Sequence, residues 1–348
     1  MSNYLDNRLS LWDLNMKQPH IGSYDYTLLN EPYRGGSCLV YPVLRHETVG
    51  NKTYERRVFL KEFYPILEID ERNGMYRNPD GSIYVAETVK NSSGYQKGLT
   101  DFHESYIRML ELSKFEQSAE LLVVPLLIVE DNGTWYREEA YDAGTSFSRL
   151  FRDKECGFSE FLQAMGKCYQ AIAGLHQVGY YHLDVKPQNI AYTYRKGIKL
   201  FDADSFVKKN HLKGVRIQYW SEGYSAPEII AAASTPEDTQ YLIGPWTDVY
   251  SLAQIICWYL FGRPININET DWLLEELYVR VIERSNVGIY DGGRVGLDME
   301  LDDEVSVSLE GIDYLASFLL RSLTPHRRRR YQSVEDAYED FRMVASYF

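Results

Sequence analysis

Three polar side chains with different chemistry lie close together in the segment His182-Leu183-Asp184-Val185-Lys186-Pro187-Gln188-Asn189. Lys186 follows Asp184 by two residues, and Asn189 follows it by five. A carboxylate can accept a proton, an ammonium group can neutralise anionic charge, and a carboxamide oxygen can bind a metal ion. A solvated loop of charged residues is the alternative interpretation. The motifs that follow along the chain favour a reactive site.

A further carboxylate, Asp202, comes 13 residues after Asn189 and directly follows the strand-like run Ile198-Lys199-Leu200-Phe201. Farther along are Tyr224-Ser225-Ala226-Pro227-Glu228 and Thr247-Asp248-Val249-Tyr250-Ser251-Leu252. With these motifs in this order, the chain resembles the protein kinase superfamily, in particular bacterial serine/threonine protein kinases of the eukaryotic-like type. The resemblance extends over roughly residues 24–348.

The resemblance implies a role for each of these side chains in transfer of the γ-phosphoryl group of ATP. Asp184 would orient the substrate hydroxyl and accept its proton, while Lys186 neutralises the transferring group. Asn189 and Asp202 would hold Mg²⁺. The spacing of Lys186 from Asp184 is similar to that of serine/threonine kinases. The resemblance to these enzymes also implies that Ser221 hydrogen-bonds to both Asp184 and Lys186.

Two supporting contacts are also implied. Asp248 would brace the catalytic loop, and Arg328 or Arg330 would pair with Glu228, although the four arginines from residue 327 to residue 330 could also form a solvated basic patch. We expect His182 to be buried and structural.

Nucleotide binding is expected in the first part of the chain. Lys61, in Val58-Phe59-Leu60-Lys61-Glu62, resembles the strand lysine that contacts the α- and β-phosphates of ATP. Gly35 and Gly36 precede it between two strand-like runs, where a phosphate-covering hairpin is expected. Ala140 and Tyr141 fall in the segment expected to contact adenine.

Lys61 would need a glutamate on the helix of the small lobe. Glu104 and Glu111 are the two candidates, and being seven residues apart they share a helical face. Either glutamate could instead be an ordinary exposed residue. The expected helix spans residues 95–116, with apolar positions at Phe102, Tyr106, Ile107, Leu110 and Phe115.

The sequence departs from the family pattern around both nucleotide-binding motifs. Tyr33 and Cys38 replace the first and third glycines of the hairpin, so close backbone approach to phosphate remains only near Gly35 and Gly36. Ala203 and Asp204 follow Asp202 where a phenylalanine and a glycine are usual.

Two further departures concern regulation and the adenine pocket. Leu183 replaces an arginine that meets an activation-segment phosphate, so we expect no phosphorylation switch through this position. The hinge segment from Arg137 to Tyr141 is unusually polar, with Glu139 near the back of the adenine pocket.

The secondary structure that must position these residues is predicted to change from strands to helices near residue 142. Strand-like segments and turn signals dominate from about residue 24 to residue 141, including the hairpin turn at residues 131–134. Helical periodicity begins with Phe161, Met165, Tyr169, Ile172 and Leu175, and Gly179 ends that helix. We therefore expect an α+β, bilobal protein-kinase-like fold, with a small β-rich N-terminal lobe carrying one main helix and a larger, mainly helical C-terminal lobe. The expected parts are an extension over 1–23, the ATP-binding lobe over 24–142 and the catalytic and substrate-docking lobe over 143–348.

Composition narrows the classes of partner. The chain of 348 residues has a formal net charge of −13, which disfavours nucleic acid and acidic lipid. Its four cysteines show no metal-binding or disulfide spacing, and no apolar stretch is long enough to span a bilayer. We expect a cytoplasmic protein that acts on a protein substrate, without binding nucleic acid or membrane; the oligomeric state is open.

Two other functions remain compatible with the sequence. The altered hairpin and metal loop also fit a pseudokinase that acts as a nucleotide-binding or scaffold module. A kinase-fold enzyme that acts on a small molecule or transfers AMP is the third possibility, although the Ala-Pro-Glu motif favours a polypeptide substrate.

Overall fold

The computed structural model describes residues 19–34, 38–65, 74–115, 122–123, 125–140, 145–152, 156–193, 197–217, 220–266, 273–285 and 309–348. The expected extension over 1–23 lies mostly outside these ranges. The chain forms two compact units, Met1–Asp142 and Ala143–Phe348.

The first unit is built on a seven-stranded antiparallel sheet with the order β1-β2-β4-β5-β9-β8, in which β3 also pairs with β4. Its strands are β1 (His20–Ile21), β2 (Tyr24–Leu28), β3 (Tyr33–Arg34), β4 (Cys38–Val49), β5 (Lys52–Phe63), β8 (Pro125–Asp131) and β9 (Thr134–Ala140). The expected turn between β8 and β9 is confirmed: Asn132 and Gly133 both have positive φ, as a tight hairpin requires.

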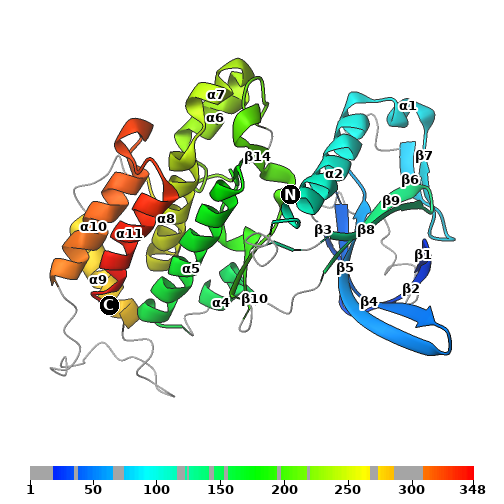
Figure 1. Cartoon of the computed structure of the whole chain (residues 1–348), viewed down its shortest axis with the longest axis horizontal. Helices are drawn as coiled ribbons and strands as arrows, with labels where there is room; N and C mark the ends of the chain where they lie inside the picture. Colours follow the sequence, from blue (N-terminus) through cyan, green and yellow to red (C-terminus); the bar gives the residue numbers. More distant parts are fainter. Residues whose placement is uncertain are drawn as a thin grey trace. The chain divides into compact units, whose positions relative to one another are not determined.

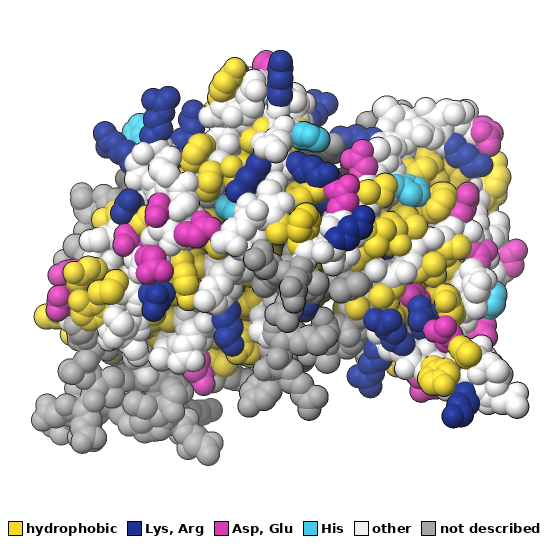
Figure 2. Space-filling view, viewed as in Figure 1, with side chains coloured by type: hydrophobic (Ala, Val, Ile, Leu, Met, Phe, Trp, Pro, Cys, Tyr) yellow, Lys and Arg dark blue, Asp and Glu magenta, His cyan; other side chains and the backbone are white. Residues whose placement is uncertain are grey.

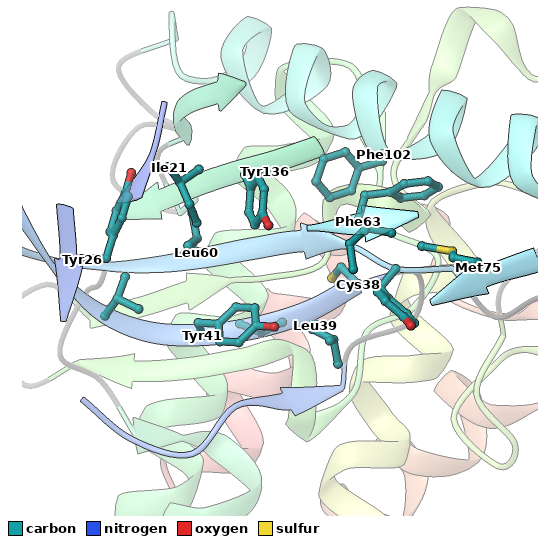
Figure 3. Packing of buried hydrophobic residues seen from close by; sticks show 14 of the residues in the cluster. Ile21, Tyr26, Cys38, Leu39, Tyr41, Leu60, Phe63, Met75, Phe102 and Tyr136 are labelled. Atoms are coloured by element: carbon teal, nitrogen blue, oxygen red, sulfur yellow. The ribbon is translucent and has the colours of Figure 1, made fainter. Parts of the chain in front are cut away.

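One long helix, α2 (Ser93–Leu112), packs on this sheet (Figure 1). The Ser92 side chain caps its first turn. Figure 3 shows the Phe102 ring of α2 beside the Phe63 ring at the end of β5, and the two ring centroids are 5.5 Å apart. The buried residues of the helix are Tyr95, Phe102, Ser105, Met109 and Leu112.

The expected apolar face of α2 is therefore partly wrong. Ile107, Leu110 and Phe115 are exposed hydrophobic residues. Phe102 and Met109 are seven residues apart, as are Ser105 and Leu112, and this repeat gives the true buried face.

An insertion between β5 and α2 carries a small hairpin, β6 (Met75–Arg77) with β7 (Ile83–Val85), and the short helix α1 (Glu87–Lys90). The hairpin is tied to the large sheet by the fully buried Glu62 of β5. The Glu62 carboxylate accepts hydrogen bonds from the Arg77 guanidinium and from the Tyr41 and Tyr136 hydroxyls, each hydroxyl at 2.7 Å.

The second unit is mainly helical. Its helices are α4 (Phe147–Arg152), α5 (Phe158–Gln177), α6 (Pro227–Ser234), α7 (Thr239–Leu242), α8 (Pro245–Phe261), α9 (Leu273–Ser285), α10 (Leu309–Leu323) and α11 (Val334–Ala345). In Figure 1, α5, α8, α10 and α11 lie side by side. The Phe161 ring of α5 stacks on the Tyr259 ring of α8 with centroids 3.9 Å apart.

Short strands in this unit frame the loops that carry chemistry. They are β10 (Thr145–Ser146), β12 (Ile190–Thr193) and β13 (Gly197–Leu200) in one sheet, and β11 (Tyr180–Tyr181) with β14 (Val207–Lys208) in another. The α+β, bilobal architecture expected from the sequence is confirmed.

On the face shown in Figure 2, Lys and Arg side chains are spread along the edge of the second unit near α6 and α7.

Candidate active site

Asp248, in the first turn of α8, binds the backbone of the loop between β11 and β12. Asp248 Oδ1 accepts the Leu183 N–H and Oδ2 accepts the His182 N–H, each at 2.8 Å. Oδ2 also lies 2.8 Å from His176 Nε2. Burial alone would raise the pKa of Asp248, but the hydrogen bond and charge of His176 lower it below its ordinary value. The expected bracing contact is thus present, and it stabilises Leu183 in a left-handed conformation with φ of 65°.

Three side chains converge on the Asp184 carboxylate. Its Oδ1 accepts the Ser221 hydroxyl at 2.6 Å, and its Oδ2 accepts Lys186 Nζ at 2.7 Å and Asn189 Nδ2 at 2.9 Å. Lys186 Nζ also donates to Ser221 Oγ at 2.8 Å. The structure therefore brings together Asp184, Lys186 and Asn189, and it contains the expected contacts of Ser221. Hydrogen bonds to a charged carboxylate hold it in one orientation.

Asp202 is placed next to this group by the backbone. The Phe201 N–H donates to the Asn189 carbonyl at 2.9 Å, so the residue before Asp202 is joined to Asn189 itself. Asp202 has a φ of 62° and is exposed. An amide oxygen and a carboxylate are ligands that suit Mg²⁺. Within the described ranges, no three His, Cys, Asp or Glu side chains lie close enough together to hold a metal ion.

His182 is fully buried beneath the loop, as expected. Its ring lies 4.6 Å from the Phe206 ring, and its Nδ1 accepts the Asp184 N–H at 3.3 Å. Burial lowers the pKa of His182 below its ordinary value. A neutral imidazole therefore supports the catalytic loop.

The segment after Asp202 packs against the loop through apolar contacts. Leu183, with 1% of its surface exposed, belongs to a buried cluster with Leu212, Ile217 and Ile229. Leu212 and Ile217 lie in the activation segment, between Asp202 and the Ala226-Pro227-Glu228 motif. Hydrophobic packing thus connects the activation segment to Leu183, the position at which the family pattern has an arginine.

Of the two candidate arginines, Arg330 is the one that pairs with Glu228. Arg330 Nη1 lies 2.7 Å from Glu228 Oε1, while Arg328 is exposed. Glu228 Oε1 also accepts the Thr247 hydroxyl at 3.0 Å. The open choice between Arg328 and Arg330 is thereby settled.

Lys61 lies on β5 of the first unit, where its Nζ is 2.9 Å from Glu139 Oε1 of β9. The sequence led us to expect a glutamate from the helix instead. Glu104 is exposed and Glu111 is partly exposed on α2, and neither belongs to the buried face of that helix. Glu139 was noted in the sequence for its polarity, but its pairing with Lys61 was missed.

The remaining predicted nucleotide-binding residues are only partly described. Gly35, Gly36 and Tyr141 lie outside the described residues, whereas Ala140 is the last residue of β9 and pairs with Val58. The strands on either side of the two glycines, β3 and β4, pair in antiparallel register with Tyr33 opposite Val40.

A β-rich unit with one long helix, followed by a helical unit that presents an Asp-Lys-Asn loop and a second aspartate, defines the protein kinase class. Residues 83–333 match the family model of the protein kinase domain, and the chain belongs to this family. No helix in the described part of the chain is long and apolar enough to cross a membrane.

Curated relatives are distant. The chain is 24% identical over 186 residues to Citron Rho-interacting kinase of Mus musculus, which covers 53% of this chain and 9% of the relative. It is 26% identical over 189 residues to mitosis inhibitor protein kinase SWE1 of Candida albicans, covering 53% of this chain and 15% of the relative. The chain thus spans a small fraction of the length of these relatives.

A solved structure titled PpkA-294 apo form is similar in fold. It aligns with a TM-score of 0.59 at 21% identity, covering 93% of this chain and 97% of that chain.

Proposed function

We propose that this protein kinase transfers the γ-phosphoryl group of ATP to serine or threonine hydroxyls of a protein substrate, in a Mg²⁺-dependent reaction. The observation that carries the proposal is the Asp184 carboxylate, which is bonded to Ser221, Lys186 and Asn189 at 2.6 to 2.9 Å. This arrangement supports a base that is already oriented before substrate arrives.

In the proposed step, the substrate hydroxyl oxygen forms a bond to the γ-phosphorus while the bond from that phosphorus to the leaving ADP oxygen breaks. Asp184 orients the hydroxyl and takes its proton. Lys186 neutralises charge on the transferring group, and Lys61 holds the α- and β-phosphates. Asn189 and Asp202 would hold Mg²⁺, which supplies charge neutralisation of the phosphates.

Serine and threonine specificity is supported by Lys186, which reaches both Asp184 and Ser221. The Ala226-Pro227-Glu228 region is anchored to α8 through Thr247, which suits docking of a polypeptide. A cytoplasmic location is part of the proposal, because the spacing of the four cysteines suggests no disulfide framework.

The decisive experiment is transfer of radiolabel from [γ-³²P]ATP by the purified protein to generic protein substrates, with Asp184→Asn as the matched control. We expect Mg²⁺-dependent labelling of serine or threonine that falls at least about a hundredfold in the variant, because general-base catalysis contributes ~10²–10⁴-fold. ATP binding without transfer by the wild-type protein would support a nucleotide-binding pseudokinase instead.

A further inference from the structure

The carboxylate next to Lys61 comes from the neighbouring strand. In the antiparallel pairing of β5 with β9, Lys61 lies opposite Arg137 and Phe59 lies opposite Glu139. Lys61 and Glu139 are therefore diagonal neighbours on one face of the sheet, within reach of long side chains. Their ion pair closes at 2.9 Å between Nζ and Oε1.

The Glu139 carboxylate is itself fixed by a second cation. Arg137 Nη2 lies 2.9 Å from the same Oε1, and both the Arg137 and the Glu139 side chain are 3% exposed. Arg137 Nη1 donates to the Phe102 carbonyl of α2 at 3.2 Å, and its guanidinium lies 4.9 Å from the centre of the Phe102 ring. Because the Glu139 carboxylate is almost excluded from water, solvent screens its attraction to Lys61 only weakly.

The buried face of α2 carries no acidic residue. Ser105 is fully buried between Phe102 and Met109 on that face. At 100° per residue, Glu104 and Glu111 lie about 100° and 120° around the helix axis from Ser105, on the same side. The buried face of α2 thus carries a hydroxyl group and no carboxylate.

We propose that Glu139 is the positioning residue for Lys61, so that the phosphate-binding lysine is oriented by the sheet itself and not by a glutamate of helix α2. The significance for catalysis rests on the proposed function, in which Lys61 holds the phosphates. Since β5 and β9 are adjacent hydrogen-bonded strands, both partners of this ion pair belong to the sheet, and Arg137 links the pair to the backbone of α2.

The test combines a chemical measurement that needs no activity with a kinetic one. Acetylation of Lys61 by acetic anhydride, without nucleotide, is followed by peptide mass spectrometry and normalised to the exposed Lys52. The variants are Glu139→Gln and, because the single change leaves Arg137 buried without its carboxylate, the double variant Arg137→Gln/Glu139→Gln. Matched controls are Glu104→Gln and Glu111→Gln, with melting temperatures measured for all.

We expect Lys61 to be acetylated at least about threefold faster when Glu139 is neutralised, because the amine loses the ion pair that holds and encloses it. The same variants should lose at least about tenfold in kcat/KM for ATP, equivalent to ~1.4 kcal/mol. Both helix variants should stay within about twofold of the wild-type protein in each measurement.

Two results would overturn the inference: unchanged acetylation of Lys61 in both Glu139 variants, or a larger increase in Glu104→Gln or Glu111→Gln. Failure of the proposed function gives a different pattern. In that case the wild-type protein shows no phosphoryl transfer, while the acetylation rates still report whether Glu139 holds Lys61.

Discussion

Arg330 Nη1 lies 2.7 Å from Glu228 Oε1, joining the loop before α11 to the end of the activation segment, and the two side chains are 0% and 4% exposed. Removing one partner of a buried ion pair leaves the other charge without compensation. We therefore expect Arg330→Met to lower the free energy of unfolding by about 3–5 kcal/mol in urea titrations. The exposed Arg328→Ala should change it by less than about 0.5 kcal/mol.

A double-mutant cycle separates the pair from simple loss of packing. Arg330→Met/Glu228→Leu should be less destabilised than the sum of the two single variants, because no buried charge remains. Strict additivity would show that the two side chains act independently.

Activity should not depend on phosphorylation of the activation segment. Leu183 cannot pair with a phosphate, and its packing against Leu212 and Ile217 already orders the segment. After broad phosphatase treatment, verified by intact mass, we expect turnover to change less than about threefold. A phosphate contact made by one to three charge-assisted hydrogen bonds of ~1.5–3 kcal/mol each would give far larger losses. A large drop reversed by rephosphorylation would mean that Lys208 or Lys209 performs the arginine's role.

Nucleotide binding should require a divalent ion. If Asn189 and Asp202 bind Mg²⁺ together with phosphate, ATP with Mg²⁺ at ~100 times Kd should stabilise the protein by ~2.7 kcal/mol in a thermal-shift assay, and ATP alone should do much less. Asp202→Asn is the control; because Asp202 is exposed, the variant should melt at nearly the wild-type temperature without ligand. Equal shifts with and without Mg²⁺ would contradict the metal assignment.

Acid should destabilise the catalytic unit below about pH 6.5. Burial lowers the pKa of His182 despite the charges of Asp248 and Asp184, which raise it, while Lys186 lowers it further. The unfolded chain therefore binds a proton near pH 6.5 that the folded chain does not bind, and stability falls as pH drops, by at most ~1.4 kcal/mol per pH unit for this group. Urea midpoints between pH 7.5 and 5 should fall less steeply in His182→Phe than in the wild-type protein.

The exposed His211→Asn provides the control for that measurement, and its midpoints should follow the wild-type pH dependence. His182→Asn, which keeps an acceptor near the Asp184 N–H, serves if the phenylalanine variant does not fold. Parallel curves for all variants would show that His182 does not carry the acid effect.

The catalytic loop was predictable because its chemistry is local. Asp184, Lys186 and Asn189 lie within one short loop, so spacing alone brings them near one another, and Gly179 marks the end of the preceding helix with a φ of 91°. The bilobal architecture followed from the change from strand-like to helical periodicity near residue 142.

The partner of Lys61 was not predictable in the same way. It depends on the register of β5 against β9, which are about 80 residues apart in sequence. The spacing of Glu104 and Glu111 correctly placed both on one helical face. Which face meets the sheet is decided by Phe102, Ser105 and Met109, and a buried serine among apolar residues gives little signal in a sequence.

Glu62 also determines how the first unit can open. If the β6–β7 hairpin detached alone, the Glu62 carboxylate would lose Arg77 and remain charged inside an apolar core, which costs several kcal/mol. The hairpin and the large sheet should therefore unfold as one cooperative unit, with the amide hydrogens of Asn78 and Ala86, which donate to the Ser82 and Gly74 carbonyls, exchanging nearly as slowly as those of β5. An insertion that looks like a turn-rich surface loop in the sequence is in this sense part of the core.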